Sequence, residues 1–293
     1  GSVAGMAAAL ARYGSMPLAT VMAPAIRLAK DGFVVDSALF RSLRGSRNAL
    51  TQFAGKELFY PGGEPLAPGT RLVQADLAHT LEIIAARGPA GFYTGEVADA
   101  LVAEMTRGGG IITLEDLRRY KAEWRTPIRS TYRGYTLYTM PPASSGGITM
   151  TETMNILETF APLPAYGSAA YSHLLAEAFR RSFIDRNAKL ADPAFVKVPI
   201  EQLTSKAYAR DLAGTIDRAH ATRTPAFKSS PEPEHTTHYS VADNNGNVVA
   251  TTTTLNGGYG SGVCIPKGGA FMNNEMDDFA AKPGTANMFG LVQ

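Results

Sequence analysis

The chain has 293 residues, a formal net charge of +2, 45% hydrophobic residues and 18% charged residues. This balance is typical of a globular protein that forms one large domain or two small ones. A near-neutral charge without a block of basic residues argues against nucleic acid as a main partner. No apolar run approaches the length of a membrane span, and the single cysteine, Cys264, excludes a disulfide within the chain.

Helical periodicity dominates the chain as far as residue 216. Apolar side chains recur every three to four residues, and glycines follow several of these stretches. Thr113, which is followed by Glu115 and Asp116, predicts a helix N-cap. We expect helices at residues 3–13, 18–31, 37–52, 74–86, 95–106, 114–120, 148–160, 168–190 and 201–216.

Two stretches have the pattern of β-hairpins. Residues 128–140 alternate as strands do, with a turn at Arg133 and Gly134. Residues 235–243 and 248–256 are rich in β-branched and aromatic side chains and flank a polar Asn-Gly turn. Such a pair of runs around Asn-Gly is a strong hairpin signal.

A glycine-rich loop and a polar cluster follow the second hairpin. Residues 255–262 contain four glycines, which suit a backbone that approaches a ligand or another strand closely. Residues 271–279 then bring together three carboxylates and two amides. The combination predicts the rim of a ligand pocket.

For three other reactive or charged features we favour structural interpretations. Ser144 and Ser145 precede a predicted helix, so capping is favoured over a nucleophilic role. Cys264 lies among small apolar residues, as a buried core thiol does. Four charged residues of the long predicted helix are expected to form a surface ion-pair face. They are Arg180, Arg181, Asp185 and Arg186.

The junction before the second hairpin suggests a chemistry. Residues 219–235 are rich in Pro, Ser and Thr and are expected to form an exposed, mobile linker. A threonine hydroxyl is a weak nucleophile unless a base lies beside it. Cleavage before Thr236 would free its α-amine, a base with a pKa of about 7.7–8 in model peptides. One residue would then supply both nucleophile and base.

Five motifs occur together in this chain: Tyr-Gly-Ser-Met-Pro-Leu at 13–18, Pro-Pro-Ala-Ser-Ser-Gly-Gly at 141–147, Thr-Thr-His-Tyr-Ser-Val at 236–241, Thr-Leu-Asn at 254–256 and Asn-Asn-Glu-Met-Asp-Asp-Phe at 273–279. With their spacing, they resemble the γ-glutamyltranspeptidase family of N-terminal-nucleophile hydrolases. The resemblance covers essentially the whole chain, and the motifs together are highly specific.

The resemblance implies an α+β fold, a layered αββα sandwich that is incomplete in this chain and has a helical first half. It also implies a zymogen that cuts itself between His235 and Thr236. Residues 1–235, with the linker 219–235, would belong to the large subunit. Residues 236–293 would start the small subunit with the hairpin and the glutamyl-binding loop.

By the same resemblance, the activity is transfer or hydrolysis of γ-glutamyl groups, with glutathione as donor and an amino acid, a dipeptide or water as acceptor. Thr236 corresponds to the catalytic threonine and Thr254 to the hydroxyl that hydrogen-bonds it. Asn256, Glu275 and Asp278 correspond to the acceptors of the glutamyl α-ammonium, since a buried ammonium needs oxygen ligands. No cofactor or metal is expected, and the implied compartment is periplasmic or extracellular.

Some family features are displaced or altered. The arginine for the donor carboxylate would lie upstream of Gly1, and the oxyanion glycines beyond Gln293, so we expect a trimmed fragment that is itself inactive. Residues 282–284 resemble the start of the lid over the glutamyl site. Phe289 stands where bacterial relatives often carry a tyrosine, and its ring cannot hydrogen-bond Asn256.

Two alternatives stay open. One is an acylase of the same fold for glutaryl-type side chains, which carry no α-ammonium and therefore have less use for Asp278. The other is a non-catalytic homologue that only binds a γ-glutamyl or peptide ligand. The presence of both Thr236 and Thr254 argues against this second alternative.

Overall fold

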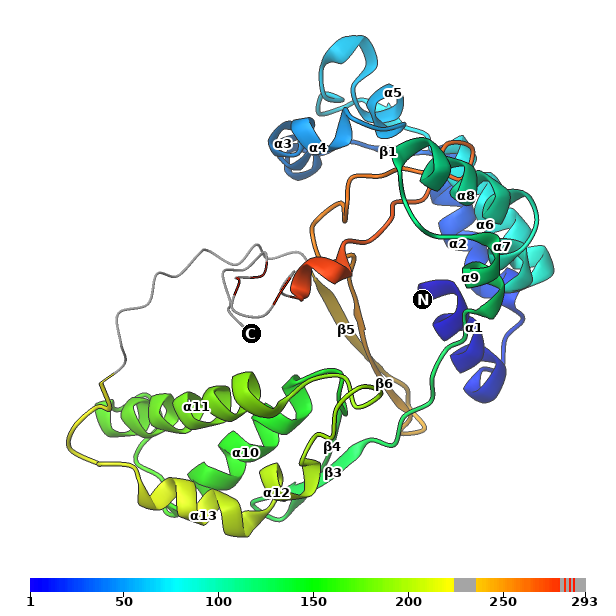
Figure 1. Ribbon diagram of the computed structural model, residues 1–293. Coiled ribbons are helices and arrows are strands. Elements are labelled where there is room, and N and C mark those ends of the chain that lie inside the picture. Colours follow the sequence, from blue (N-terminus) through cyan, green and yellow to red (C-terminus); the bar gives the residue numbers. More distant parts are fainter. Residues whose placement is uncertain (224–235, 280–281, 283–284, 286, 288–293) are drawn as a thin grey trace. The chain divides into compact units, whose positions relative to one another are not determined.

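The computed structural model describes residues 1–223, 236–279, 282, 285 and 287 (Figure 1). These residues form two compact units. The first unit contains residues 1–123, 236–279 and 287, and the second contains residues 124–223, 282 and 285. The first unit is therefore assembled from segments that precede and follow the second unit in the sequence.

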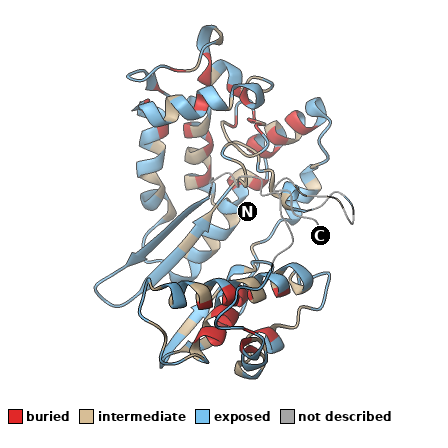
Figure 2. Ribbon diagram, turned by 90° about the vertical axis from the view of Figure 1, so that its left-hand side faces the viewer, coloured by how far each residue is buried: buried red, intermediate tan, exposed pale blue. Residues whose placement is uncertain are grey.

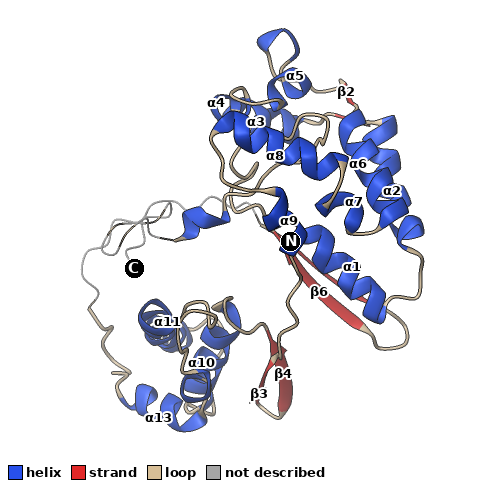
Figure 3. Ribbon diagram, turned by 45° about the vertical axis from the view of Figure 1, so that its right-hand side comes forward, coloured by secondary structure: helices blue, strands red, loops and turns tan. Residues whose placement is uncertain are grey.

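Short helices make up most of the first unit (Figures 1 and 3). The helices are α1 Ser2–Tyr13, α2 Leu18–Asp31, α3 Ser37–Gly45, α4 Arg47–Leu50, α5 Gly55–Phe59, α6 Ala75–Arg87, α7 Ala90–Tyr93, α8 Glu96–Gly108 and α9 Leu114–Arg119, with 3₁₀ helices η1 Pro61–Gly63 and η2 Glu275–Asp278. The strands are β1 Phe33–Val34, β2 Arg71–Leu72, β5 Thr237–Ala242 and β6 Val248–Thr253.

Local sequence signals determine several helix ends. Gly32 ends α2 with φ +74°, a conformation in which a side chain is strained. Thr113 and Asp116 form a reciprocal capping box at the start of α9, as predicted. The single helix predicted over 37–52 is wrong, because Ser46 leaves the helical conformation and separates α3 from α4.

Two apolar clusters form the core of the first unit. Leu43, Leu50 and Phe59 belong to one, and Leu101 and Ile265 belong to the other. Residues after the hairpin therefore complete a core that begins in the first 123 residues. Among the helices in the described part of the chain, none is long and apolar enough to cross a membrane.

The second predicted hairpin is confirmed as β5 and β6, which pair from Thr237↔Thr253 to Ala242↔Val248. Five residues connect the strands, so the loop is longer than a two-residue Asn-Gly turn. Asp243 Oδ1 accepts hydrogen bonds at 2.9 Å from the backbone N–H groups of Asn245 and Asn247 and so fixes this loop. Both strands are largely exposed (Figure 2).

The second unit combines one hairpin with a helical layer. Its elements are β3 Ile128–Tyr132, β4 Tyr135–Thr139, α10 Gly146–Glu158, α11 Ala169–Lys189, α12 Ile200–Leu203 and α13 Lys206–Gly214. The predicted turn is confirmed at Arg133 and Gly134, which have φ +50° and +86°. The continuous helix predicted over 201–216 is wrong, because Ser205 caps a new helix by accepting from Tyr208 N at 3.1 Å.

Helix α10 lies at the centre of the second unit and is buried on most sides, as Figure 2 shows. Ile156 and Leu157 pack with Leu174 and Ala178 of α11 and with Ala209 of α13. Because neighbours cover α10 on several faces, it has almost no amphipathic pattern in the sequence.

The surface ion-pair face predicted on α11 is wrong. Arg181 is 10% exposed and bonds at 2.6 Å to Glu177, which is 5% exposed. Asp185 is also buried, and it accepts from the Tyr208 hydroxyl of α13 at 2.6 Å. Tyr208 of α13 covers Asp185, whereas Glu177 accepts from the backbone N–H and the hydroxyl of Thr222. These groups come from later in the chain and are not identifiable from the pattern of α11 alone.

Residues 219–223 of the predicted linker are exposed. The rest of the linker, including His235, lies outside the described residues, as do Pro283, Gly284 and Phe289.

Candidate functional site

Thr236 and Thr254 lie opposite one another just beyond the last paired residues of the β5–β6 hairpin. Thr237↔Thr253 is the last pair of the hairpin. Thr236, which precedes β5, and Thr254, which follows β6, therefore lie at the same end of the hairpin. Thr236 Oγ1 donates to Thr254 Oγ1 at 3.3 Å. Thr254 Oγ1 also accepts from the backbone N–H of Asn256 at 2.8 Å. The hydrogen bonds therefore connect a strand-initial hydroxyl to the glycine-rich loop.

Asn256 adopts a left-handed backbone conformation, with φ +71°. A non-glycine residue holds this conformation only when its surroundings fix it. Its Nδ2 donates to the carbonyl oxygen of Asn274 at 3.0 Å. The residues on both sides of Asn256 are also held, because Leu255 O accepts from Asn274 N at 3.0 Å and Gly257 N donates to Asn274 Oδ1 at 2.8 Å.

The η2 turn carries the acidic side of the candidate site. Glu275 Oε1 is buried and has no hydrogen-bond partner among the described residues. Burial, followed by the proximity of the Asp278 carboxylate, raises the pKa of Glu275. A buried acceptor beside a second carboxylate favours a cationic ligand, which would supply both the missing hydrogen bond and the compensating charge.

The structure brings the predicted site residues into one connected segment of the first unit. Hydrogen bonds join Thr236, Thr254 and Asn256 directly, and Asn274 connects them to the turn that holds Glu275 and Asp278. Asn274 is not among the site residues expected from the sequence. Its only signal there is its position directly before Glu275, in the Asn-Asn pair that precedes the acidic turn.

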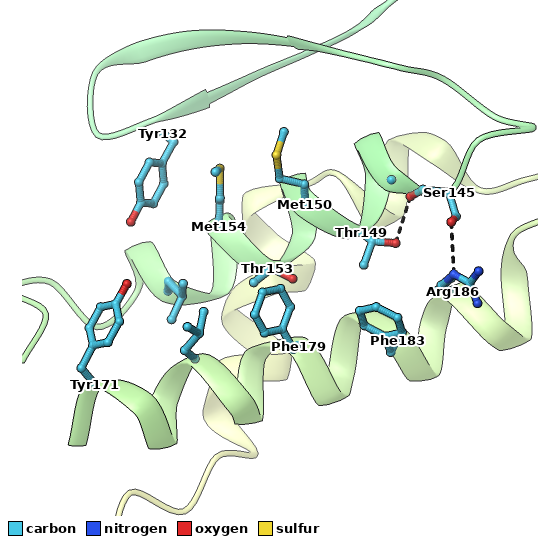
Figure 4. A pocket seen from close by; sticks show the side chains of 13 residues that line it. Tyr132, Ser145, Thr149, Met150, Thr153, Met154, Tyr171, Phe179, Phe183 and Arg186 are labelled. Atoms are coloured by element: carbon cyan, nitrogen blue, oxygen red, sulfur yellow. Dashed lines mark hydrogen bonds between the residues drawn. The ribbon is translucent and has the colours of Figure 1, made fainter. Parts of the chain in front are cut away.

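A cavity with a volume of about 500 Å³ lies in the second unit, between α10, α11 and β3 (Figure 4). Met150, Met154, Phe179 and Phe183 line it with apolar atoms. Among the described residues that line it, there is no carboxylate and no pair of nucleophile and base. This cavity is therefore a poor candidate for an acyl-transfer site.

Ser145 lies at one end of this cavity, where Figure 4 shows it beside Arg186. It occupies the N-cap position of α10, but its side chain does not cap the helix. Its Oγ instead accepts from Arg186 Nε at 3.1 Å. The predicted capping role of Ser145 is therefore wrong, because its hydroxyl bonds the arginine and not the N–H groups of the first helical turn.

Cys264 is confirmed as a buried thiol. Burial raises its pKa to about 11, and the nearby carboxylates of Asp76 and Glu104 add to the effect. Because the thiolate is the nucleophilic form, this residue is inert near neutral pH.

Comparisons with known proteins show the family of this chain. The family model described as gamma-glutamyltranspeptidase matches residues 1–293. A glutathione hydrolase proenzyme of Escherichia coli strain K12 is 48% identical over 299 residues, which are 100% of this chain and 52% of that protein. An acylase ACY 1 proenzyme of Pseudomonas strain SE83 is 44% identical over 98% of this chain and 52% of its own length. The chain thus spans about half the length of these relatives.

Solved structures give the same result. The γ-glutamyltranspeptidase of Helicobacter pylori is 38% identical, with a TM-score of 0.73 over 76% of this chain and 64% of that one. A cephalosporin acylase from Bacillus halodurans is 30% identical, with a TM-score of 0.83 over 97% of this chain and 52% of that one. These likenesses confirm the predicted α+β fold of N-terminal-nucleophile hydrolases. The chain belongs to the γ-glutamyltranspeptidase family.

Proposed function

We propose that this chain is part of an enzyme that transfers or hydrolyses the γ-glutamyl group of glutathione-like amides, with Thr236 as nucleophile. The observation that carries the proposal is the hydrogen bond from Thr236 Oγ1 to Thr254 Oγ1 at 3.3 Å, at the end of a strand pair. A neighbouring hydroxyl fixes the direction of a nucleophilic oxygen before it attacks. Family membership supports the same assignment.

Maturation precedes turnover in this proposal. Thr236 Oγ attacks the carbonyl carbon of residue 235, the peptide C–N bond breaks, and the acyl group moves from nitrogen to oxygen. Water then hydrolyses the ester and leaves Thr236 with a free α-amine. That amine accepts the hydroxyl proton in turnover, because its pKa in model peptides lies near neutrality, at about 7.7–8. A periplasmic or extracellular location fits a proenzyme of this family.

Turnover uses the same oxygen. Thr236 Oγ attacks the γ-carbonyl of the donor, the amine product leaves with a proton, and an acyl-enzyme ester forms. Water or the amine of an amino acid or dipeptide then takes the acyl group. The donor α-ammonium binds to Asn256, Glu275 and Asp278, and the unpartnered Glu275 Oε1 supports this assignment.

The test uses the protein made from its complete reading frame. We expect Thr236→Ala to remain a single chain and to lose turnover of a γ-glutamyl anilide. Thr236→Ser, which keeps the hydroxyl, should retain cleavage. The matched control is Thr237→Ala, because Thr237 points to the opposite face of the same strand. Intact mass showing the Thr236→Ala protein cut at the same bond would refute the proposal.

A second candidate function is an acylase for glutaryl side chains, which the 44% identity to an acylase proenzyme favours. The two functions differ in the α-ammonium of the donor. Asp278 beside Glu275 suits a donor that carries this charge. Turnover of a γ-glutamyl anilide compared with a glutaryl anilide distinguishes them, and faster turnover of the glutaryl compound would establish the acylase.

A further inference from the structure

We propose that Asn274 is a positioning residue that holds Asn256 and the Glu275–Asp278 turn in one geometry, an inference that rests on the proposed function of those groups. Asn274 does not touch the reacting atoms in this proposal. It acts through the residues that would bind the donor ammonium.

Hydrogen bonds connect Asn274 to both parts of the site. Its backbone N–H donates to Leu255 O at 3.0 Å, and its carbonyl oxygen accepts from Asn256 Nδ2 at 3.0 Å. Its side-chain Oδ1 accepts from Gly257 N at 2.8 Å, and its Nδ2 donates to Asp277 Oδ2 at 2.9 Å. One residue therefore contacts Asn256 and both of its neighbours in the chain, as well as the η2 turn.

The main chain and the side chain of Asn274 bond to backbone groups on both sides of Asn256. Its N–H group donates to Leu255 O, and its Oδ1 accepts from Gly257 N. These contacts fix the chain immediately before and after Asn256, which has φ +71°. The left-handed conformation directs the Asn256 side chain, so losing the Gly257 contact allows it to relax.

The approach of the two segments is close. A Cβ atom added at Gly257 would lie 3.2 Å from Asn274 Oδ1 and 3.3 Å from Gly260 O. Glycine at this position therefore permits the amide of Asn274 to reach the backbone N–H. This close contact explains why a glycine stands at position 257 of the loop.

An amide at position 274 has a specific chemical role, because it accepts from Gly257 and donates to Asp277 at once. Aspartate keeps the acceptor but places two carboxylates together. In the double variant Asn274→Asp with Asp277→Asn, the amide and carboxylate exchange places and both hydrogen bonds are possible again. This exchange distinguishes positioning by hydrogen bonds from a simple effect on folding.

The experiment uses the enzyme made from its complete reading frame. For Asn274→Ala we expect the KM for a γ-glutamyl anilide to rise about tenfold or more, the size of effect that one or two lost hydrogen bonds produce. Self-cleavage should persist, and kcat should change much less than KM. The exchange variant should recover most of the wild-type KM, whereas Asn274→Asp alone should not.

The matched control is Asn247→Ala, which also removes an asparagine that bonds an aspartate, with Asn247 Nδ2 at 2.8 Å from Asp243 Oδ2 in the hairpin loop. It should leave KM unchanged. Hydrogen exchange of the Gly257 amide gives a readout independent of activity, and we expect faster exchange in Asn274→Ala.

An unchanged KM or unchanged Gly257 exchange in Asn274→Ala would overturn the proposal, as would an exchange variant no better than Asn274→Asp. If the wild-type enzyme does not turn over the anilide, the proposed function fails, while the exchange measurement still decides whether Asn274 holds the loop.

Discussion

At the scale of single residues, side chains of the same type have different environments because of their neighbours. Thr236 and Thr254 meet at the end of a hairpin, whereas Thr153 lies in the core and donates to Ser182 at 2.9 Å. Glu275 and Glu152 are both carboxylates with an unpartnered buried oxygen. Only Glu275 lies in a segment that hydrogen bonds connect to Thr236. These hydrogen bonds, and not the residue type, therefore distinguish the candidate site.

We expect Asp278 to contribute charge to donor binding. The substitution Asp278→Asn keeps the size of the side chain and removes its charge. We therefore expect kcat/KM for a γ-glutamyl anilide to fall about 100-fold, a loss of about 2.7 kcal/mol of transition-state stabilisation. A glutaryl anilide, which lacks the ammonium, should lose much less. Asp277→Asn, which keeps an acceptor for Asn274, is the control. Equal losses on both donors would show that Asp278 has a structural role.

The sequence contained most of the candidate site but not its organisation. Thr236, Thr254 and Glu275 follow from the resemblance of their motifs to those of the family. Asn274 does not, because its role depends on which backbone groups lie opposite it after folding. Ser145 was misjudged for a similar reason, since Arg186 comes from 41 residues away.

At the scale of elements, polar groups between α10, α11 and α13 form a buried network. Glu152 of α10 is 1% exposed. Burial and then the proximity of Asp185 raise its pKa to about 8, and Lys189 opposes this only in part. Lys189 and Tyr208 both bond Asp185. Glu152 is therefore mostly protonated at neutral pH.

The protonated state of Glu152 predicts how the stability of the second unit changes with pH. The folded pKa of about 8 lies well above the ordinary glutamate value of 4.5, so the folded state binds the extra proton. The free energy of unfolding should therefore fall as pH rises from about 4.5 to about 8 and then level off.

Glu152→Gln tests this prediction, because glutamine has the shape of the protonated acid. We expect the variant to match the wild type near pH 5 and to be more stable by about 1–3 kcal/mol near pH 9. Urea unfolding at both values is the measurement. Glu201→Gln, on the exposed part of α12, is the control. A variant with the same pH dependence as the wild type would show that Glu152 is already ionised.

The sequence largely predicts where the longer helices and the hairpins lie, but not where a helix is interrupted. Caps and glycines in the sequence marked α2 and α9, and the hairpins followed from their turns. The breaks at Ser46 and Ser205 were missed because apolar spacing continues across both. The burial of Glu177 and Asp185 was missed because the covering groups come from later segments.

At the scale of the whole molecule, the first unit joins segments far apart in the sequence. Ile265 is 1% exposed and belongs to the cluster of Leu101. Thr80 Oγ1 donates to Gly268 O at 2.8 Å in a buried position. Phe271 stacks on Phe59, with ring centroids 5.7 Å apart. Sequence patterns show that these residues are apolar or small, but not that they meet.

These contacts predict the behaviour of the protein after cleavage at residue 235. Because the 255–272 segment completes a core built by residues 33–120, the two products should stay together without a covalent bond. We expect one species by size-exclusion chromatography and two bands on a denaturing gel. Ile265→Asp would bury an unpaired charge, so the products should separate at lower urea, with a loss of at least about 3 kcal/mol.

Lys267→Ala is the matched control, because only the backbone N–H of Lys267 contacts Asp76, at 3.1 Å, and alanine keeps that donor. The control should separate at the same urea concentration as the wild type. Products of the wild type that elute separately in native buffer would contradict the prediction. Such a result would mean that the apolar contacts of Ile265 and Phe271 do not hold the two chains together.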